Sequence, residues 1–157
     1  MRGILLALAV AVAAGGVARA GGDSREGYYY PPVTSEETFT RTIGEVPEAS
    51  RAVRVNFVTR ITKAQLAAPE SPRFVIFAKG AQADHMIIVA LDDEIFRTLY
   101  RARAVLAQLT GNVRGTDFFV KAGIADRATW FDLMRILGFR DLVISDGATW
   151  SHRVVFE

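Results

Sequence analysis

The sequence predicts an α+β domain that has a single antiparallel or mixed sheet with two helices packed on a face. Phe74–Ala78 and Met86–Leu91 are apolar at both odd and even positions, as in strands that are covered on both faces. A run with apolar residues at helical spacing follows them, and Asp146-Gly147 separates two further apolar runs, which is typical of a hairpin. Consecutive helices combined with mostly antiparallel strands favour the α+β class over an alternating α/β fold.

The first twenty residues have the three parts of a secretory signal peptide. Arg2 supplies a basic start, Ile4–Ala14 is apolar throughout, and Ala18-Arg19-Ala20 fits the small-x-small pattern that signal peptidase cleaves. A retained membrane anchor is the alternative, but the apolar run is much shorter than the roughly twenty residues that span a bilayer. We therefore expect cleavage after Ala20 and a periplasmic location.

Charge and cysteine content exclude several classes of function. Cleavage removes Arg2 and Arg19 from the 19 basic side chains, which leaves 17 against 17 acidic ones. A near-neutral chain lacks the positive surface that nucleic acids and anionic membranes attract, so we expect no nucleic-acid partner. The sequence has no Cys, which excludes disulfides, thiolate metal sites and lipid attachment at a mature N-terminal Cys.

After the signal peptide, the chain is predicted to form an extended arm, residues 21–33, and one domain, residues 34–157. Tyr28–Pro32 joins three tyrosines to two prolines, and such aromatic area with polar tips suits recognition of a partner. The alternative is that the arm packs over its own core, as most aromatic clusters do. Thr34–Ile43 mixes turn, helix-start and strand signals, so its structure is left open.

The segment between the arm and the central strands is predicted to be a strand towards one side of the sheet. Val53–Thr62 alternates with a period of two, which favours a half-buried antiparallel strand. Lys63–Ala68 has room for one helical turn. Pro69 and Pro72 then mark a connection, because proline has a fixed φ and no N–H.

A hairpin turn at Lys79–Asp84 is predicted to join the two central strands, and the main helix comes after them. Asp92-Asp93-Glu94 places acceptors and negative charge where a helix leaves its first N–H groups unpaired, while Gly111-Asn112 and Gly115 supply a stop. The inward positions recur at spacings of three and four residues. They are Ile95, Phe96, Leu99, Ala102, Leu106 and Leu109.

The last part of the chain is predicted to add a second helix and a hairpin. Ala128–Leu137 has helical spacing and ends at Gly138, the residue that a left-handed cap prefers. A short Phe118–Val120 run precedes this helix. Leu142–Ser145 and Trp150–Phe156 flank Asp146-Gly147 as the two strands of the hairpin.

Residues with catalytic or metal-binding chemistry are few and scattered. His85 and His152 are far apart and have no metal-ligand spacing, and His152 shares strand parity with apolar neighbours, which favours a hydrogen-bonded core histidine. Lys79-Gly80 could present an amine and N–H groups to an anion, but no phosphate-binding motif surrounds it. Ser145 lies near His152 if the hairpin forms, yet the nucleophile-elbow motif is absent. We expect no metal and no cofactor, while any chemical role of Lys79, His85 and His152 stays open.

Two surfaces are predicted as binding regions. One is the arm with Tyr28, Tyr29 and Tyr30, and the other is the polar face of the main helix with Arg97 and Arg101. A simple solvated face is the alternative for the helix, with Arg101 close enough to Arg97 to prefer an acidic partner from elsewhere. Arg103 lies away from this stripe.

Several motifs give the mature chain a family resemblance: FAKG, IIVALDDEIFRTLYRARAVLAQLT, TDFF, TWFDL, GF and LVISDG. With these it resembles small exported proteobacterial proteins of unknown function, which are sometimes labelled molybdopterin-guanine dinucleotide biosynthesis protein A. That nucleotidyltransferase family opens with a Leu-Ala-Gly-Gly loop followed by Ser, Arg, Met and Gly. Here Ala13-Ala14-Gly15-Gly16 lies in the signal segment without the rest of the pattern.

Together these observations predict a periplasmic, non-enzymatic binding protein. The expected role is that of an accessory or assembly factor that acts on an envelope protein. A small-molecule-binding or enzymatic periplasmic domain is the alternative. The two differ in one structural respect, because the alternative requires a concave pocket lined by convergent polar groups.

Overall fold

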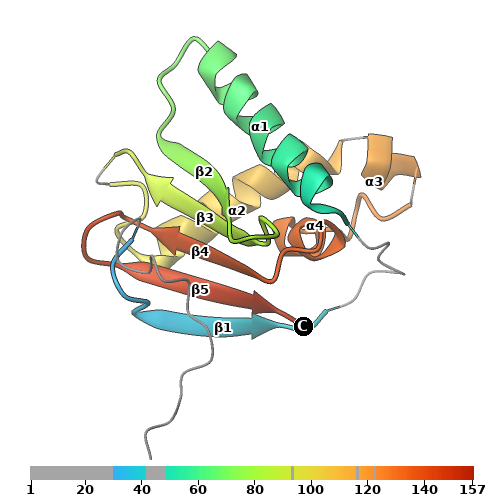
Figure 1. The fold of residues 1–157 in the computed structure, drawn as a ribbon. Helices are drawn as coiled ribbons and strands as arrows, with labels where there is room; N and C mark the ends of the chain where they lie inside the picture. The colour runs from blue at the N-terminus through green and yellow to red at the C-terminus, as the bar shows by residue number, and fades with distance from the viewer. Residues whose placement is uncertain (1–29, 42–48, 93, 116, 122) are drawn as a thin grey trace, which may run out of the picture.

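The computed structural model describes residues 30–41, 49–92, 94–115, 117–121 and 123–157 (Figure 1). Within these ranges the chain forms five strands and four helices. The predicted signal peptide lies outside the described residues, as do Tyr28 and Tyr29. In chain order the elements are β1 (Ser35–Phe39), α1 (Arg51–Ala67), β2 (Phe74–Lys79), β3 (His85–Ala90), α2 (Leu99–Arg114), α3 (Asp117–Lys121), α4 (Trp130–Ile136), β4 (Asp141–Ser145) and β5 (Ser151–Phe156).

The strands form one mixed sheet in the order β1-β5-β4-β3-β2, which confirms the α+β class. β2 with β3 and β4 with β5 are antiparallel, whereas β3 with β4 and β1 with β5 are parallel. The prediction that both apolar runs are central is wrong for β2, which lies at an edge. Apolar residues on both faces show only that both faces are covered; they do not show how many strands flank the run.

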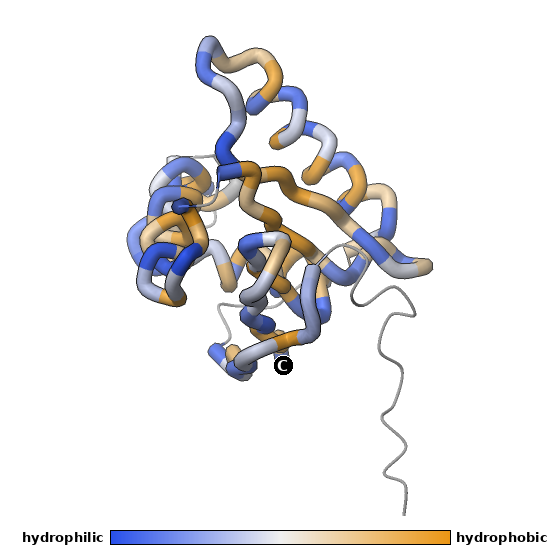
Figure 2. The backbone as a smooth tube through the Cα atoms, turned by 90° about the vertical axis from the view of Figure 1, so that its left-hand side faces the viewer, coloured by the Kyte–Doolittle hydropathy of each residue, from blue (hydrophilic) through white to orange (hydrophobic). Residues whose placement is uncertain are grey.

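The two faces of the sheet are covered by different parts of the chain. Ile76, Met86, Ile88, Leu142, Ile144 and Val154 share one core cluster with residues of all four helices. Figure 1 shows α2 passing behind the strands, and in Figure 2 much of the apolar, orange tube follows the strands. On the other face, Ile87 and Val143 pack with Tyr30 in a second, smaller cluster. The predicted packing of helices on one face is therefore confirmed, although the helices number four rather than two.

Helix α1 corrects the predicted strand at Val53–Thr62. The Ser50 side chain caps its start by accepting from the N–H of Val53 at 3.4 Å, and the helix continues for 17 residues, through the predicted turn at Lys63. Phe57, Val58 and Ile61 pack against the core at spacings that also fit a helix. The β-branched residues favour a strand only weakly. The packing of one helical face against the core therefore makes this segment a helix.

The main helix, α2, begins later than predicted. Thr98 is its cap and accepts from the N–H of Arg101 at 3.3 Å, whereas Asp92 accepts from the N–H of Glu94 in a preceding turn. The helix also runs through Gly111 and ends beside Gly115. Ile95, Phe96, Ala102, Leu106 and Leu109 are buried as predicted, and Leu99 is half-buried.

The C-terminal elements follow the prediction closely. Thr129 and Asp132 form a reciprocal capping box at the start of α4, and Gly138 follows its end with a φ of +72°. β4 and β5 form the hairpin around Asp146-Gly147, where Gly147 has a φ of +80°. The Phe118–Val120 run belongs to the short helix α3, whose Phe119 is buried in the core.

Candidate functional site

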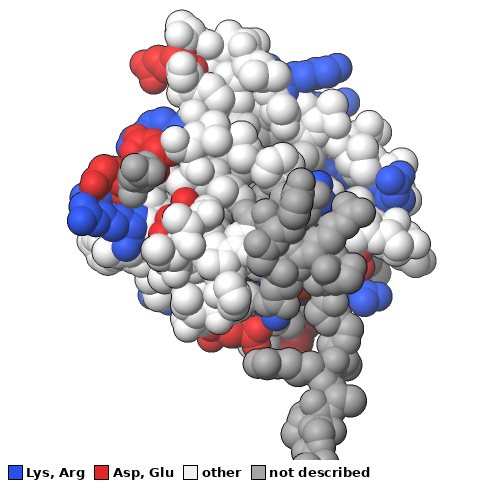
Figure 3. Space-filling view, turned by 60° about the vertical axis from the view of Figure 1, so that its left-hand side comes forward, with Lys and Arg blue, Asp and Glu red and all other residues white. Residues whose placement is uncertain are grey.

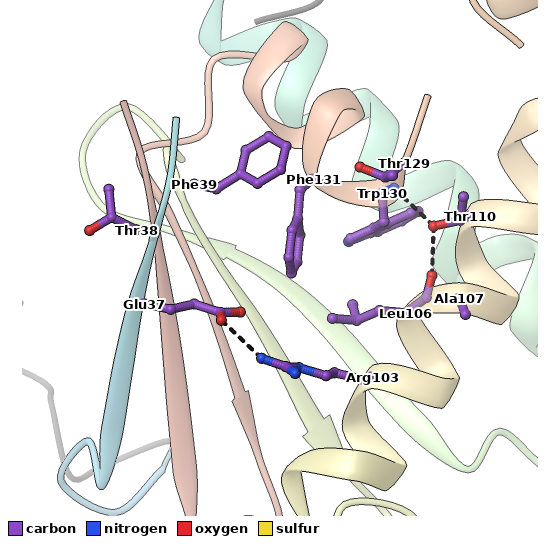
Figure 4. A pocket seen from close by; sticks show the side chains of 10 residues that line it. All are labelled: Glu37, Thr38, Phe39, Arg103, Leu106, Ala107, Thr110, Thr129, Trp130 and Phe131. Atoms are coloured by element: carbon purple, nitrogen blue, oxygen red, sulfur yellow. Dashed lines mark hydrogen bonds and ion pairs between the residues drawn. The ribbon is translucent and has the colours of Figure 1, made fainter. Parts of the chain in front are cut away.

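A cleft of about 340 Å³ opens between strand β1 and helices α2 and α4 (Figure 4). Its volume falls in the range of small-molecule and side-chain sites. Most of its wall is apolar, while Arg103 and Glu37 stand at one side of it. The lining residues are Glu37, Thr38, Phe39, Arg103, Leu106, Ala107, Thr110, Thr129, Trp130 and Phe131.

The cleft follows from the periodicity of the elements around it. Glu37 and Phe39 are two residues apart on β1 and therefore point to the same, helix-covered face. On α2 the lining residues recur at helical spacing, and Thr110 joins α2 to α4 because its hydroxyl accepts from the N–H of Trp130 at 2.9 Å. The Phe39 and Phe131 rings meet edge to face at 5.3 Å, so the aromatic wall is held by mutual packing.

A chain of four polar groups begins with Arg103 and Glu37, which line the cleft, and continues to His152 and Ser35, which do not. Glu37 Oε2 contacts the Arg103 guanidinium at 3.1 Å, and its Oε1 lies 3.3 Å from His152 Nε2. His152 Nδ1 in turn lies 2.8 Å from the Ser35 hydroxyl. His152 is 3% exposed and stacks on Trp150, which confirms the prediction of a hydrogen-bonded histidine beside the core.

The Glu37–His152 contact is a close approach rather than a hydrogen bond. The separation is short, but His152 Nε2 is a buried atom that makes no hydrogen bond with the described residues. Glu37 is consequently held mainly by Arg103, whose side chain is 60% exposed and reaches from α2 across to the edge strand.

The predicted binding residues lie elsewhere. Tyr30 is 7% exposed and packs with Ile87 and Val143 on the sheet face opposite the helices. The arm is also tied to the start of β5, because the Ser151 hydroxyl lies 3.0 Å from the backbone oxygens of Pro31 and Pro32. The described part of the arm therefore packs on its own domain, as the structural alternative predicted.

Arg97 and Arg101 share one acidic partner. Their guanidinium groups contact Glu94 at 2.8 and 2.7 Å, and Arg101 also donates to the Glu94 backbone oxygen at 2.6 Å. The Arg101 hydrogen bond, followed by the charge of Arg97, holds the pKa of Glu94 below its usual range. Figure 3 shows acidic and basic side chains side by side on one part of the surface rather than a patch of one sign.

The structure does not bring the predicted residues together with the cleft, and the prediction missed Glu37 and Arg103. In the sequence, Arg103 lies on a different side of the helix from Arg97 and Arg101. This position was the only local indication that Arg103 has a different partner. Its partner Glu37 is 66 positions away, so no local pattern could join them.

The remaining candidates, Lys79 and His85, lie near the hairpin between β2 and β3. The Lys79 amine lies 5.3 Å above the Phe77 ring. His85 Nδ1 is 2.9 Å from Asp141, and its Nε2 is 3.7 Å from Asp84, which is itself paired with Arg140 at 2.9 Å. The two carboxylates face opposite nitrogens of the ring, so they do not converge on a shared ion. Across the described residues no cluster of three or more His, Asp or Glu side chains is suited to a metal.

Comparison with family models, with curated proteins and with solved structures finds no match for this chain. The family resemblance of its motifs therefore stays a prediction. In the part of the chain that the structure describes, no helix is both long and apolar enough to cross a membrane.

Proposed function

We propose that this chain is an exported binding protein without catalytic function, which acts on an envelope partner as an accessory or assembly factor. The observation that supports this proposal is the composition of the cleft. Aromatic and aliphatic side chains form most of its wall, and its two charged residues, Glu37 and Arg103, already pair with each other. Such a site holds an apolar group well and offers a substrate little chemistry.

The partner in this proposal presents an apolar side chain with a carboxylate beside it. Phe39, Leu106 and Phe131 provide the apolar contact. Arg103 is exposed and pairs with Glu37 at the rim, so a carboxylate of the partner can share its guanidinium at little desolvation cost. Arg103 is more exposed than Glu37, so its guanidinium is the group of the pair that a carboxylate of the partner would contact.

An enzyme is the second candidate, because Ser35, His152 and Glu37 form a hydroxyl, imidazole and carboxylate sequence. In serine hydrolases the hydroxyl contacts Nε2 and the acid holds Nδ1. Here the two nitrogens have exchanged roles, and Nε2 lacks a hydrogen bond to the acid among described residues. A fluorophosphonate probe distinguishes the candidates: we expect no labelling of Ser35, whereas labelling that Ser35→Ala abolishes favours the enzyme.

The binding proposal is tested by filling the cleft. Ala107 is exposed and lines it, so Ala107→Trp should occupy the space without disturbing the core. Gln108→Trp adds the same side chain to the next position of α2, outside the cleft, and is the matched control. Recovery of a crosslinked partner from the periplasm should fall about tenfold or more in the first variant only. Equal recovery with both variants contradicts the proposal.

The anionic aromatic dye 1-anilinonaphthalene-8-sulfonate provides a check that needs no partner. It combines an apolar body with a negative group, as the cleft requires. Its fluorescence on the native chain should decrease with Ala107→Trp and with Arg103→Ala, but not with Gln108→Trp. The unfolding midpoint of each variant shows whether a change comes from the cleft or from loss of structure.

A further inference from the structure

The free edge of β2 has a regular hydrogen-bonding pattern. The N–H of Leu91 donates to the Arg73 oxygen at 2.8 Å, so this pair starts the ladder with β3. Hydrogen-bonded and non-bonded pairs alternate in an antiparallel ladder, and the register then directs Val75 and Phe77 towards β3. The backbone groups of Phe74, Ile76 and Ala78 consequently point away from the sheet.

One contact supports this assignment independently. The side-chain amide of Gln65, on α1, donates to the Phe74 oxygen at 3.0 Å, so that oxygen faces α1 and not β3. Gln65 thus occupies the first outward acceptor of the edge. The outward N–H and C=O groups of Ile76 and Ala78 have no partner within the described residues.

A groove of about 340 Å³ runs along this edge between α1 and β2. Figure 1 shows α1 rising beside β2 at the end of the sheet. Val58 and Thr62 contribute from the helix, and Val75–Ala78 contributes from the strand. Lys63 is exposed and is the single charged residue among those that line the groove.

We propose that this groove binds an extended polypeptide segment of a partner, which adds to the edge of β2 as a further strand. Each of Ile76 and Ala78 offers one donor and one acceptor at the two-residue repeat of a strand, which is the complement of another extended backbone. Alternate side chains of the added segment lie under α1 against Val58 and Thr62, so these positions are apolar. An acidic side chain or a C-terminal carboxylate lies near Lys63.

This inference goes beyond the function proposed for the cleft. β1 and β2 are the two opposite edges of the sheet, and none of the groove residues lines the cleft. Either proposal can therefore be wrong while the other is right. A segment that binds at β2 must be insensitive to Ala107→Trp.

The first experiment selects ligands from random decapeptides displayed on phage, with the mature chain as target. We expect sequences with apolar residues at alternate positions and an acidic residue or free carboxylate at one end. A selected peptide should slow amide hydrogen exchange at Ile76 and Ala78 about tenfold or more, because these N–H groups gain partners. The amides of Val75 and Phe77 already bond to β3 and should change little.

Substitutions test the same geometry. Ala78→Pro removes an N–H that β3 does not use, and proline is tolerated at such an outward position of an edge strand. Peptide affinity should fall about tenfold, the usual effect of losing one hydrogen bond. Thr59→Trp fills the groove from an exposed position of α1, and Arg60→Trp, outside the groove, is its control. If Ala78→Pro does not fold, this second pair decides the question.

Four results overturn the proposal, and the first three concern the peptides. The selection yields no peptide, or the selected peptides protect amides other than Ile76 and Ala78, or Thr59→Trp binds them as well as Arg60→Trp does. Sedimentation checks a further occupant, a second copy of the chain. If the chain forms a dimer and Ala78→Pro dissociates it, the occupant of the edge is β2 of another copy. This result also overturns the proposal of a partner segment.

Discussion

Arg54 Nη1 donates to the backbone oxygen of Gly138 at 3.3 Å, and a Cβ at Gly138 would lie only 2.9 Å from the same nitrogen. The guanidinium also donates to Ala49 O at 2.6 Å and to Gln82 O at 2.8 Å, and Arg54 is 6% exposed. It therefore ties the start of α1 to the β2–β3 turn and to the end of α4. Gly138 permits this approach because it has no side chain and tolerates a positive φ.

Replacing this buried arginine should destabilise the domain. Arg54→Ala leaves backbone acceptors of three segments without a donor, so we expect the free energy of unfolding to fall by about 2–4 kcal/mol. Arg60→Ala, at an exposed position of the same helix, should change it by less than about 0.5 kcal/mol. Urea denaturation measures both. A similar, small effect of the two variants would show that the contacts of Arg54 are dispensable.

Truncation within β3 tests the position of the central core. Ile88 is fully buried among strands and helices, so Ile88→Ala should cost about 2–5 kcal/mol. Leu66→Ala is the control, because Leu66 is 72% exposed on α1. Chemical denaturation of the two variants should therefore give clearly separated midpoints. A loss at Ile88 below about 0.5 kcal/mol would be incompatible with its burial.

Asp146 should make the hairpin sensitive to acid. Burial opposes its ionisation, but hydrogen bonds from the N–H groups of Trp150, Ala148 and Thr149 outweigh this and hold its pKa below the usual 3.8. Because the folded pKa is the lower one, the stabilisation is present above the unfolded pKa. It is lost as the pH falls through the folded value.

The variant Asp146→Asn isolates this contribution, since its side chain does not titrate. Near neutral pH its free energy of unfolding should be about 1–2 kcal/mol lower than that of the native chain. The difference should shrink as the pH falls below about 4. Unfolding measured along a pH series checks the sign, and a difference that grows in acid would refute the assignment.

Substitutions of its tyrosines test the two interpretations of the arm, packing on its own domain and recognition of a partner. Tyr30→Ser should cost about 2–4 kcal/mol, because Tyr30 is buried against Ile87 and Val143. The double change Tyr28→Ser and Tyr29→Ser tests the proposed recognition of a partner. It should abolish partner recovery and leave the denaturation midpoint unchanged. If it alters neither, the arm has no recognition role.

Export is expected from the pattern of Arg2, Ile4–Ala14 and Ala18-Arg19-Ala20. Mass spectrometry of the chain from a periplasmic fraction should identify Gly21 as the first residue. Ala20→Pro should block cleavage, because proline beside the scissile bond does not fit the small-residue pattern. Recovery of an intact chain from the cytosol would rule out the proposed location and, with it, an envelope partner.

Local patterns in the sequence were sufficient for the α+β class, for β3, α4 and the β4–β5 hairpin, and for the inward residues of α2. In each case the signal lies within a few residues: a run of apolar positions, a helical spacing, or a turn dipeptide such as Asp146-Gly147. The same reasoning failed at α1. There a period of two and helical spacing coexist in Val53–Thr62, and only packing of Phe57 and Ile61 against the sheet separates them.

Only the tertiary structure decided which strands are edges and where a site forms. The cleft joins Glu37 to Arg103, and the groove joins Gln65 to the outward oxygen of Phe74. Both pairs depend on the sheet order β1-β5-β4-β3-β2, which no run of adjacent residues encodes. The sequence by itself determined the burial of the inward residues of β3 and of the α2 segment, because that burial follows from side-chain chemistry and local period, but it did not determine the burial of Arg54 on α1. Which residues contact one another in the core depended on how the whole chain packs its helices against the sheet.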